Sequence, residues 1–151
     1  MHVSAKADYA LRAMVELASA EQLPLKGEQI AKAQDIPLKF LETILLQLKH
    51  TGIVHAQRGA HGGYWLGRPP EEITLADIFR AVEGPLVRVH GLRPEDVAYS
   101  GTAVPLRDIW IAVRVSLRTV LESVTLADLQ GGNLPQEILD LTLRPEAWTR
   151  R

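Results

Sequence analysis

The residues with the clearest chemical potential stand in one short segment, in which an arginine is followed by glycines, a histidine and a tyrosine. The segment reads Arg58-Gly-Ala-His-Gly-Gly-Tyr64. A guanidinium presents its donors in a planar fork that matches phosphate oxygens. Glycines adopt positive φ freely and let the backbone pass close to another surface. The combination favours binding to a phosphate backbone.

Groups that could carry out catalysis or hold a metal do not form a recognisable set. The 151-residue chain contains no cysteine, which excludes disulfides, thiolate metal sites and thiol chemistry. It has neither a Gly-x-Ser-x-Gly elbow nor a phosphate-binding glycine loop. His50, His55 and His61 do not follow a metal-ligand spacing, and on a helix end and a hairpin they would point apart. We therefore expect neither an enzyme nor a metal site.

Charge is distributed unevenly along a chain whose formal net charge is only −1. Residues 26–68 contain six basic side chains against three acidic ones, whereas residues 69–151 contain nine against twelve. Such asymmetry is expected when one lobe meets a polyanion and the other does not. An apolar run of roughly 18 residues, as a membrane span requires, is absent, and the amino terminus lacks the apolar core of a secretory signal. We expect a cytoplasmic protein without a membrane partner.

Three helices are predicted before the glycine-rich segment. Apolar residues at spacings of three and four indicate a helix over residues 4–20, with Ser4 as its cap. A short helix over residues 27–33 and a longer one over 37–49 follow, separated by Asp35-Ile-Pro37. A short helix, a tight turn and a longer helix make up a helix-turn-helix. We expect the longer helix to bury Leu38, Leu41, Leu45 and Leu48.

Two short stretches that are typical of strands, residues 53–58 and 64–66, lie on either side of the glycine-rich loop and predict a β-hairpin. A helix-turn-helix followed by such a hairpin is a winged helix. In that arrangement the second helix enters the major groove, and the wing reaches phosphates or the minor groove. We therefore predict a mainly α fold with a small β-hairpin wing, whose winged helix-turn-helix DNA-binding domain occupies residues 1–84.

The remainder of the chain is predicted to hold a loop and a long dimerisation helix. Thr74-Leu-Ala-Asp77 has the form of a capping box and opens a helix that ends at Gly84-Pro85. Residues 85–104 show little periodicity and form a loop of unusual length. Residues 105–151 follow as a dimerisation helix and a helical tail. Apolar residues at spacings of four and three predict packing along the same helix of a second copy, through a seam of Leu106, Trp110, Val113, Leu117, Val120 and Val124.

Read in order, several of these motifs resemble those of the Rrf2 family of bacterial transcriptional regulators, which includes IscR, NsrR and CymR. The resemblance covers nearly the whole chain, and the wing followed by Ile73-Thr-Leu-Ala-Asp77 is its most specific part. The matching segments are Tyr9-Ala-Leu-Arg-Ala-Met14, Ile30-Ala31, Ile36-Pro-Leu-Lys-Phe-Leu-Glu42, Leu48-Lys-His-Thr-Gly-Ile-Val54, Arg58-Gly-Ala-His-Gly-Gly-Tyr64, Ile73-Thr-Leu-Ala-Asp77, Glu83-Gly-Pro85 and Thr125-Leu-Ala-Asp128. The resemblance implies a sequence-specific DNA-binding regulator, a repressor, that works as a homodimer on a near-palindromic operator in double-stranded DNA.

The resemblance also implies which residues contact the operator. Pro37 stands where the family often has a small hydroxyl residue, so a phosphate contact is lost there. On the second helix the contacts fall at Lys39, Phe40, Glu42 and Thr43. On the wing the contact falls at Arg58, and we count the rest of the glycine-rich segment as candidate DNA-binding residues as well, namely Gly59, His61, Gly62, Gly63 and Tyr64.

Several of these side chains have a simpler alternative interpretation. Lys39, Thr43 and His61 could be solvated, and Phe40 could fill a gap in the core instead of contacting a thymine methyl. Glu42 is repelled by DNA unless it accepts a hydrogen bond from a cytosine amino group. For the whole chain, the alternative is a winged helix that binds proteins or serves as a scaffold. The arginine and the bare glycines of the wing favour DNA.

The sensing end departs from the family pattern. Cluster-binding relatives place three cysteines between residues 86 and 104, because iron–sulfur ligation needs thiolates, and this chain has none. Asp8 matches a carboxylate ligand of the nitric-oxide-sensing members, but a carboxylate without thiolates does not hold a cluster. We expect no cofactor. Two alternatives remain. One is control without a ligand, through a partner protein or expression level, and the other is a small-molecule effector in a pocket lined by Trp110, Tyr99, His90 and Arg93. For Trp110, burial in the dimer seam is the stronger interpretation.

Overall fold

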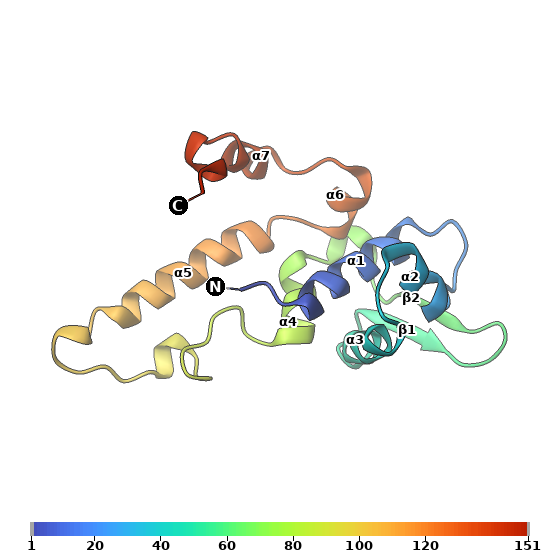
Figure 1. Cartoon of the computed structure of the whole chain (residues 1–151), viewed down its shortest axis with the longest axis horizontal. Helices are drawn as coiled ribbons and strands as arrows, with labels where there is room; N and C mark the ends of the chain where they lie inside the picture. The colour runs from blue at the N-terminus through green and yellow to red at the C-terminus, as the bar shows by residue number, and fades with distance from the viewer. Residues whose placement is uncertain (1, 151) are drawn as a thin grey trace.

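The computed structural model describes residues 2–150, which fold around a helical core from which a hairpin and a long helix project (Figure 1). Within this range one two-stranded antiparallel hairpin accompanies the helices, as predicted. The helices and strands are α1 (Ala5–Ser19), α2 (Gly27–Gln34), α3 (Leu38–His50), β1 (Val54–Gln57), β2 (Gly63–Leu66), α4 (Leu75–Glu83), α5 (Leu106–Leu121), α6 (Leu126–Gly131) and α7 (Gln136–Thr142). In the described part of the chain, no helix combines the length and the apolar character that a membrane span needs.

The helix α1 lies at the centre of the core. It contacts α2, α3, α4, α6 and β2. The Ser4 hydroxyl accepts a hydrogen bond from the Ala7 amide at 3.0 Å, which confirms the predicted helix and its cap. Small side chains let neighbouring elements approach a helix closely. The buried face of α1 consists of Ala7, Ala10, Ala13, Met14 and Leu17.

The helices α2 and α3 form the predicted helix-turn-helix. α2 ends at Gln34 and is capped by Asp35, whose φ of 52° is left-handed, a conformation that aspartate tolerates better than most residues. α3 begins at Leu38, and Pro37 lies just before it instead of taking the predicted first helical position. Leu38 is only partly buried because it sits in the exposed first turn. The fully buried residues of α3 are Leu41, Ile44, Leu45 and Leu48.

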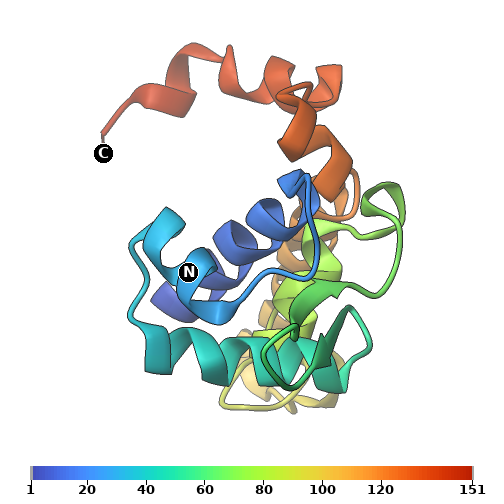
Figure 2. The same cartoon turned by 90° about the vertical axis from the view of Figure 1, so that its right-hand side faces the viewer.

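The hairpin of β1 and β2 forms the wing, and a third segment holds it in place. The strands pair antiparallel with Gln57 opposite Gly63. The Leu25 amide donates to the Tyr64 carbonyl at 3.0 Å, and the Tyr64 amide donates to the Leu25 carbonyl at 2.7 Å. Gly63 permits this pairing because its φ is 148° and a Cβ there would overlap the Leu25 carbonyl. The wing is thereby attached to the segment that precedes α2, and it lies beside the carboxyl-terminal half of α3 (Figure 2).

The starts of α4 and α6 lie side by side, although α5 separates them in the sequence. Thr74 and Thr125 each accept a hydrogen bond from the amide three residues later, as in a capping box, and the two threonines pair as an isolated β-bridge. Leu126 is fully buried. The chain therefore returns to the core after α5. The predicted division of the chain into a DNA-binding domain, a loop and a dimerisation part, with boundaries after residues 84 and 104, stays a prediction.

The helix α5 projects from the core (Figure 1), and none of its residues is buried within one chain. It ends at Leu121, so the expectation that its seam extends to Val124 is wrong. Val124 is 2% exposed, and its carbonyl accepts a hydrogen bond from the Leu75 amide at 3.0 Å. The helix stops because the chain must turn there to bring Thr125 beside α4. Val124 is consequently a core residue of the single chain.

Residues 85–104 lie along α5. They contain two short 3-10 turns, Pro94–Asp96 and Gly101–Ala103. The Trp110 indole donates to the Tyr99 hydroxyl at 2.9 Å, and Arg114 forms an ion pair with Glu95. Trp110 is thus half-buried against this loop within one chain, not only on the predicted seam.

We predict that Gly63→Ala destabilises the fold by about 1–3 kcal/mol, because a Cβ at a positive φ would collide with the backbone of Leu25. The free energy of unfolding, measured by urea denaturation, checks this. Gly27→Ala is the matched control, since a Cβ there would meet its neighbours at 3.6 and 3.7 Å, which is ordinary contact. Equal stabilities of the two variants would contradict the role given to Gly63.

Candidate nucleic-acid interface

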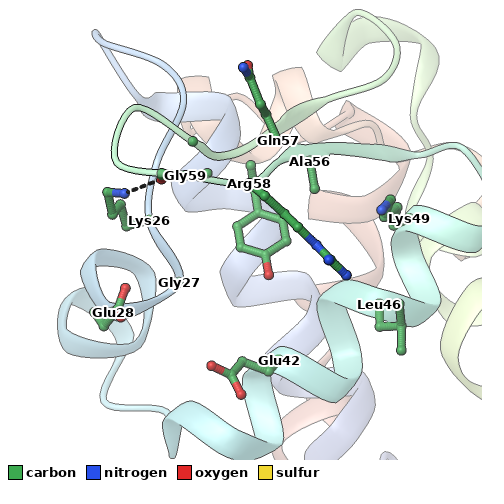
Figure 3. Close-up of a pocket in the computed structure, with 13 residues that line it drawn as sticks. Lys26, Gly27, Glu28, Glu42, Leu46, Lys49, Ala56, Gln57, Arg58 and Gly59 are labelled. Carbon is green, nitrogen blue, oxygen red and sulfur yellow. Dashed lines mark hydrogen bonds between the residues drawn. The ribbon is translucent and has the colours of Figure 1, made fainter.

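A groove of about 500 Å³ opens between the wing, the start of α2 and the outer side of α3 (Figure 3). Its walls carry three cations and two carboxylates. The cations are Lys26, Lys49 and Arg58, and the carboxylates are Glu28 and Glu42. The positive charges therefore exceed the negative ones by one.

Arg58 reaches from the wing across the groove toward α3 (Figure 3). The side chain is exposed, and it forms no ion pair with any residue between 2 and 150. An exposed guanidinium with free donors is suited to a phosphate oxygen. Arg58 can therefore contact a nucleic-acid backbone without first breaking an internal ion pair.

Lys26 and Lys49 also line the groove, although sequence reasoning assigned neither of them to the site. The Lys26 ammonium donates to the Gly59 carbonyl at 3.1 Å, which links the start of α2 to the wing (Figure 3). Lys49 stands in the last turn of α3. The available signal was their membership of the basic segment. Lys26, Lys49 and Arg58 line the same groove only because of how the wing folds back.

The outer side of α3 forms an exposed stripe at helical spacing. Glu42 belongs to both the stripe and the groove, whereas Lys39 and Thr43 lie outside the groove lining. The Thr43 hydroxyl donates to the Lys39 carbonyl at 3.3 Å. The stripe consists of Lys39, Glu42, Thr43, Leu46, Lys49 and His50.

Leu46 is a further residue of the groove that the sequence did not predict, and unlike Lys26 and Lys49 it is apolar. It is 51% exposed in the middle of the stripe and lines the groove. An apolar side chain at such a position can contact a thymine methyl in the major groove. An apolar residue on the polar side of an amphipathic helix was the signal that could have identified it.

Phe40 is separated from this stripe. Its ring packs edge-on against Tyr9 of α1, with 5.5 Å between the centroids and an interplanar angle of 80°. The ring is still 37% exposed. Of its two interpretations, packing against the body of the protein is the one for which the structure shows a partner.

The wing glycines differ in what they do. Gly59 and the neighbouring His61 are exposed at the tip. Gly62 is buried inside the turn, where its amide donates to the Gly59 carbonyl at 3.0 Å and a Cβ would overlap the Gln57 carbonyl. Gly62 and Gly63 therefore determine the shape of the wing, whereas Gly59 and His61 at its tip are accessible to a ligand.

Tyr64 supplies a neutral donor to the same groove. Burial raises the pKa of its phenol above the ordinary value, and the nearby carboxylates of Glu42 and Glu28 raise it further. The hydroxyl therefore stays protonated at neutral pH and can donate to a phosphate or a base edge.

Comparison with known proteins identifies similar chains along most of this sequence. A family model described as "Rrf2: Iron-dependent Transcriptional regulator" matches residues 3–131. The chain is 46% identical over 142 residues to Rv1287 of Mycobacterium tuberculosis, which is assigned as an HTH-type transcriptional regulator, covering 93% of this chain and 88% of that one. The structure of CymR from Bacillus subtilis superposes with a TM-score of 0.72 at 34% identity, covering 87% of this chain and 98% of that one. T. potens IscR gives a TM-score of 0.68 at 30% identity, covering 100% and 93%.

The residues present do not fit the iron that the family description mentions. Cluster ligation needs thiolates, and the chain has no cysteine. Among residues 2–150, His, Asp and Glu side chains do not gather in any group of three that could hold a metal ion. Asp8 pairs instead with Arg12 at 3.1 Å. That the protein works without such a cofactor stays a prediction.

We predict that Arg58→Ala weakens binding to all DNA sequences alike and lowers the slope of log K against log salt concentration by about one per protomer, because one phosphate contact is lost. Fluorescence anisotropy at several salt concentrations measures both effects. Arg144→Ala, which removes the same charge from the tail far from the wing (Figure 1), should leave the slope unchanged. A slope that Arg58→Ala does not alter would remove Arg58 from the interface.

We predict that Glu42→Gln relaxes base preference at one position of each half-site by about 1–3 kcal/mol, because the carboxylate accepts from a cytosine amino group. Selection from DNA randomised at each position, followed by sequencing, provides the measurement. Glu28→Gln is the matched control, since it neutralises the other carboxylate of the groove and should strengthen binding without changing preference. The assignment fails if both variants keep the wild-type preference.

Proposed function

The chain belongs to the Rrf2 family of transcriptional regulators, and from this premise we propose that it is a repressor, binding a near-palindromic operator as a homodimer without an iron–sulfur cluster. Its relatives regulate transcription, so the predictions of a family member, of a winged-helix regulator and of a protein that is not an enzyme are confirmed. The observation that carries the proposal is the free Arg58 guanidinium beside the exposed stripe of α3.

The operator-binding part of the proposal rests on the shape of this surface. The helix α3 runs along an edge of the molecule with the wing beside it (Figure 2), and the side chains of its stripe are exposed. In a winged helix this arrangement puts the helix in the major groove while the wing follows the backbone. Lys39, Thr43 and Leu46 would then face base edges, and Arg58 and Lys26 would face phosphates.

The homodimer rests on the apolar side of α5. Leu106 is 42% exposed and Ile109 is 54% exposed. The neighbouring seam residues Val113, Leu117 and Val120 are only half-buried in a single chain. Burying such a stripe against a second copy removes apolar surface from water, and a two-fold axis places two copies of α3 on one DNA.

A two-fold dimer has a consequence for the operator and for repression. The operator must be a near-palindrome with half-sites about one helical turn, or a multiple of it, apart. A dimer seated there excludes other proteins from the same DNA. This steric exclusion is the mechanism of repression that we propose.

The proposal is tested by selecting genomic DNA fragments with the purified full chain. We expect one near-palindromic motif in the enriched fragments, and raised transcription of the adjacent genes when the gene for this protein is deleted. Enrichment of single half-sites alone would contradict the dimeric operator complex. Lowered transcription after deletion would contradict repression.

We predict that Val113→Glu converts the dimer to a monomer, because a carboxylate would be placed on the seam. Light scattering at micromolar concentration measures the mass, and circular dichroism checks that the variant is folded. Val115→Glu is the matched control, since it is the same substitution on another side of α5, where Val115 is 54% exposed. A wild-type chain that is monomeric would overturn the architecture.

A further inference from the structure

We propose that a second pocket, between α4, residues 84–95 and α5, binds a small oxyanion, namely a metabolite bearing phosphate or carboxylate groups. The pocket has a volume of about 360 Å³. We call it the arginine pocket, because its lining includes Arg80, Arg93, Arg114 and Arg118 together with one carboxylate, Glu95. It lies in the part of the chain where the sequence analysis expected a sensor.

Positive charge in the arginine pocket exceeds its internal compensation. Arg80 pairs with Glu122, and Arg114 pairs with Glu95. Arg93 and Arg118 form no ion pair with any residue from 2 to 150. Like charges held close together repel one another unless an anion lies between them, so the arrangement favours a bound anion.

Arg88 adds to this positive charge. Its guanidinium lies so close to Gly84 at the edge of the pocket that a Cβ on the glycine would overlap it. Arg88 also has no ion-pair partner within the described residues. Two unpaired guanidinium groups, those of Arg93 and Arg118, therefore line the pocket, and that of Arg88 lies beside Gly84 at its edge.

Arg114 shows that the pocket is incompletely satisfied as it stands. Its side chain is 18% exposed, and its Nε atom is buried without a hydrogen-bond partner in the described structure. A buried donor without an acceptor is unfavourable. An oxyanion in the pocket would supply acceptors that Glu95 alone does not provide.

The chemistry of the lining defines the class of ligand. Guanidinium groups bind planar carboxylates and phosphates through paired hydrogen bonds, and Glu95 already holds Arg114 as such a carboxylate would. A hydrogen bond from its own backbone amide, and the bond from Arg114, lower the pKa of Glu95. Glu95 therefore stays ionised at neutral pH and competes with an incoming anion for Arg114.

The position of the pocket connects the ligand to regulation. Its lining joins α4, which packs against α1 and α3, to α5, which carries the proposed dimer seam. A ligand bound to both helices would fix the angle at which α5 leaves the core. This effector role rests on the proposed function, because the ligand would act through the spacing of the two α3 helices in the dimer. Binding of the anion to the pocket does not depend on the proposed function.

The test is isothermal titration calorimetry of the full chain at constant ionic strength, with pyrophosphate and citrate as the probes. We expect saturable binding of at least one probe, and the tighter one shows whether phosphate or carboxylate is preferred. Arg93→Gln/Arg118→Gln should weaken that binding at least tenfold, and Glu95→Gln should strengthen it severalfold. Arg144→Gln, which removes one charge outside the pocket, should leave it unchanged.

Several outcomes would overturn the proposal. It would be overturned if neither probe bound, or if the double variant bound the probe as tightly as the wild type. It would also be overturned if Arg144→Gln weakened probe binding as much as the double variant does. The double variant is also tested for DNA affinity without probe, which should stay within about twofold of wild type. A large loss there, together with no probe binding, would assign these arginines to the DNA backbone. Failure to bind the probes with DNA binding intact would leave the proposed function standing.

Discussion

The arrangement of the whole molecule depends on the small side chains along the buried face of α1. Ala7, Ala10 and Ala13 are almost inaccessible to solvent, and α2, α3, α4, α6 and β2 all contact this helix. Larger residues would push these elements outward, because an interior packed to crystal density has no room for added atoms. The alanines thus allow α3, the wing strand β2 and α6 to pack closely against the same helix. The helix α3, the strand β2 and the helix α6 are consequently held together by their contacts with α1.

A second constraint determines how the wing faces α3. The backbone of Tyr64 pairs with that of Leu25 because Gly63 has no side chain, and this pairing directs the hairpin back over the start of α2. Arg58, Lys26 and Lys49 then converge on one groove. A nearly neutral chain can bind a polyanion in this way, because local placement of a few cations governs phosphate contact more than the total charge does. Glu28 and Glu42 reduce the positive charge in the groove, and in the proposed complex they would disfavour general binding to DNA.

The loop before α5 shows how one fold accommodates different side chains. The chain shares the overall structure of CymR and IscR, yet the loop that precedes α5 contains no thiolate and instead contributes to a pocket rich in arginine. The loop is held by Trp110 and Tyr99 and by the ion pair of Arg114 with Glu95. The packing of the loop, α4 and α5 therefore does not require thiolates. Function is therefore to be argued from the side chains of the site.

Local signals in the chain were sufficient to predict the winged helix, because apolar periodicity, capping threonines and clustered glycines each act within a few residues. They were not sufficient where distant segments meet. The heptad pattern placed Val124 on the dimer seam, whereas the pairing of Thr125 with Thr74 turns the chain there and buries Val124 in the core. Phe40 and Leu46 are apolar residues of the same helix, and only the presence of Tyr9 distinguishes the packed ring from the exposed leucine. Lys26 and Lys49 became part of the site in the same way. Spacing along an element tells which residues share a side, but the covering of that side is decided by elements far away in the sequence.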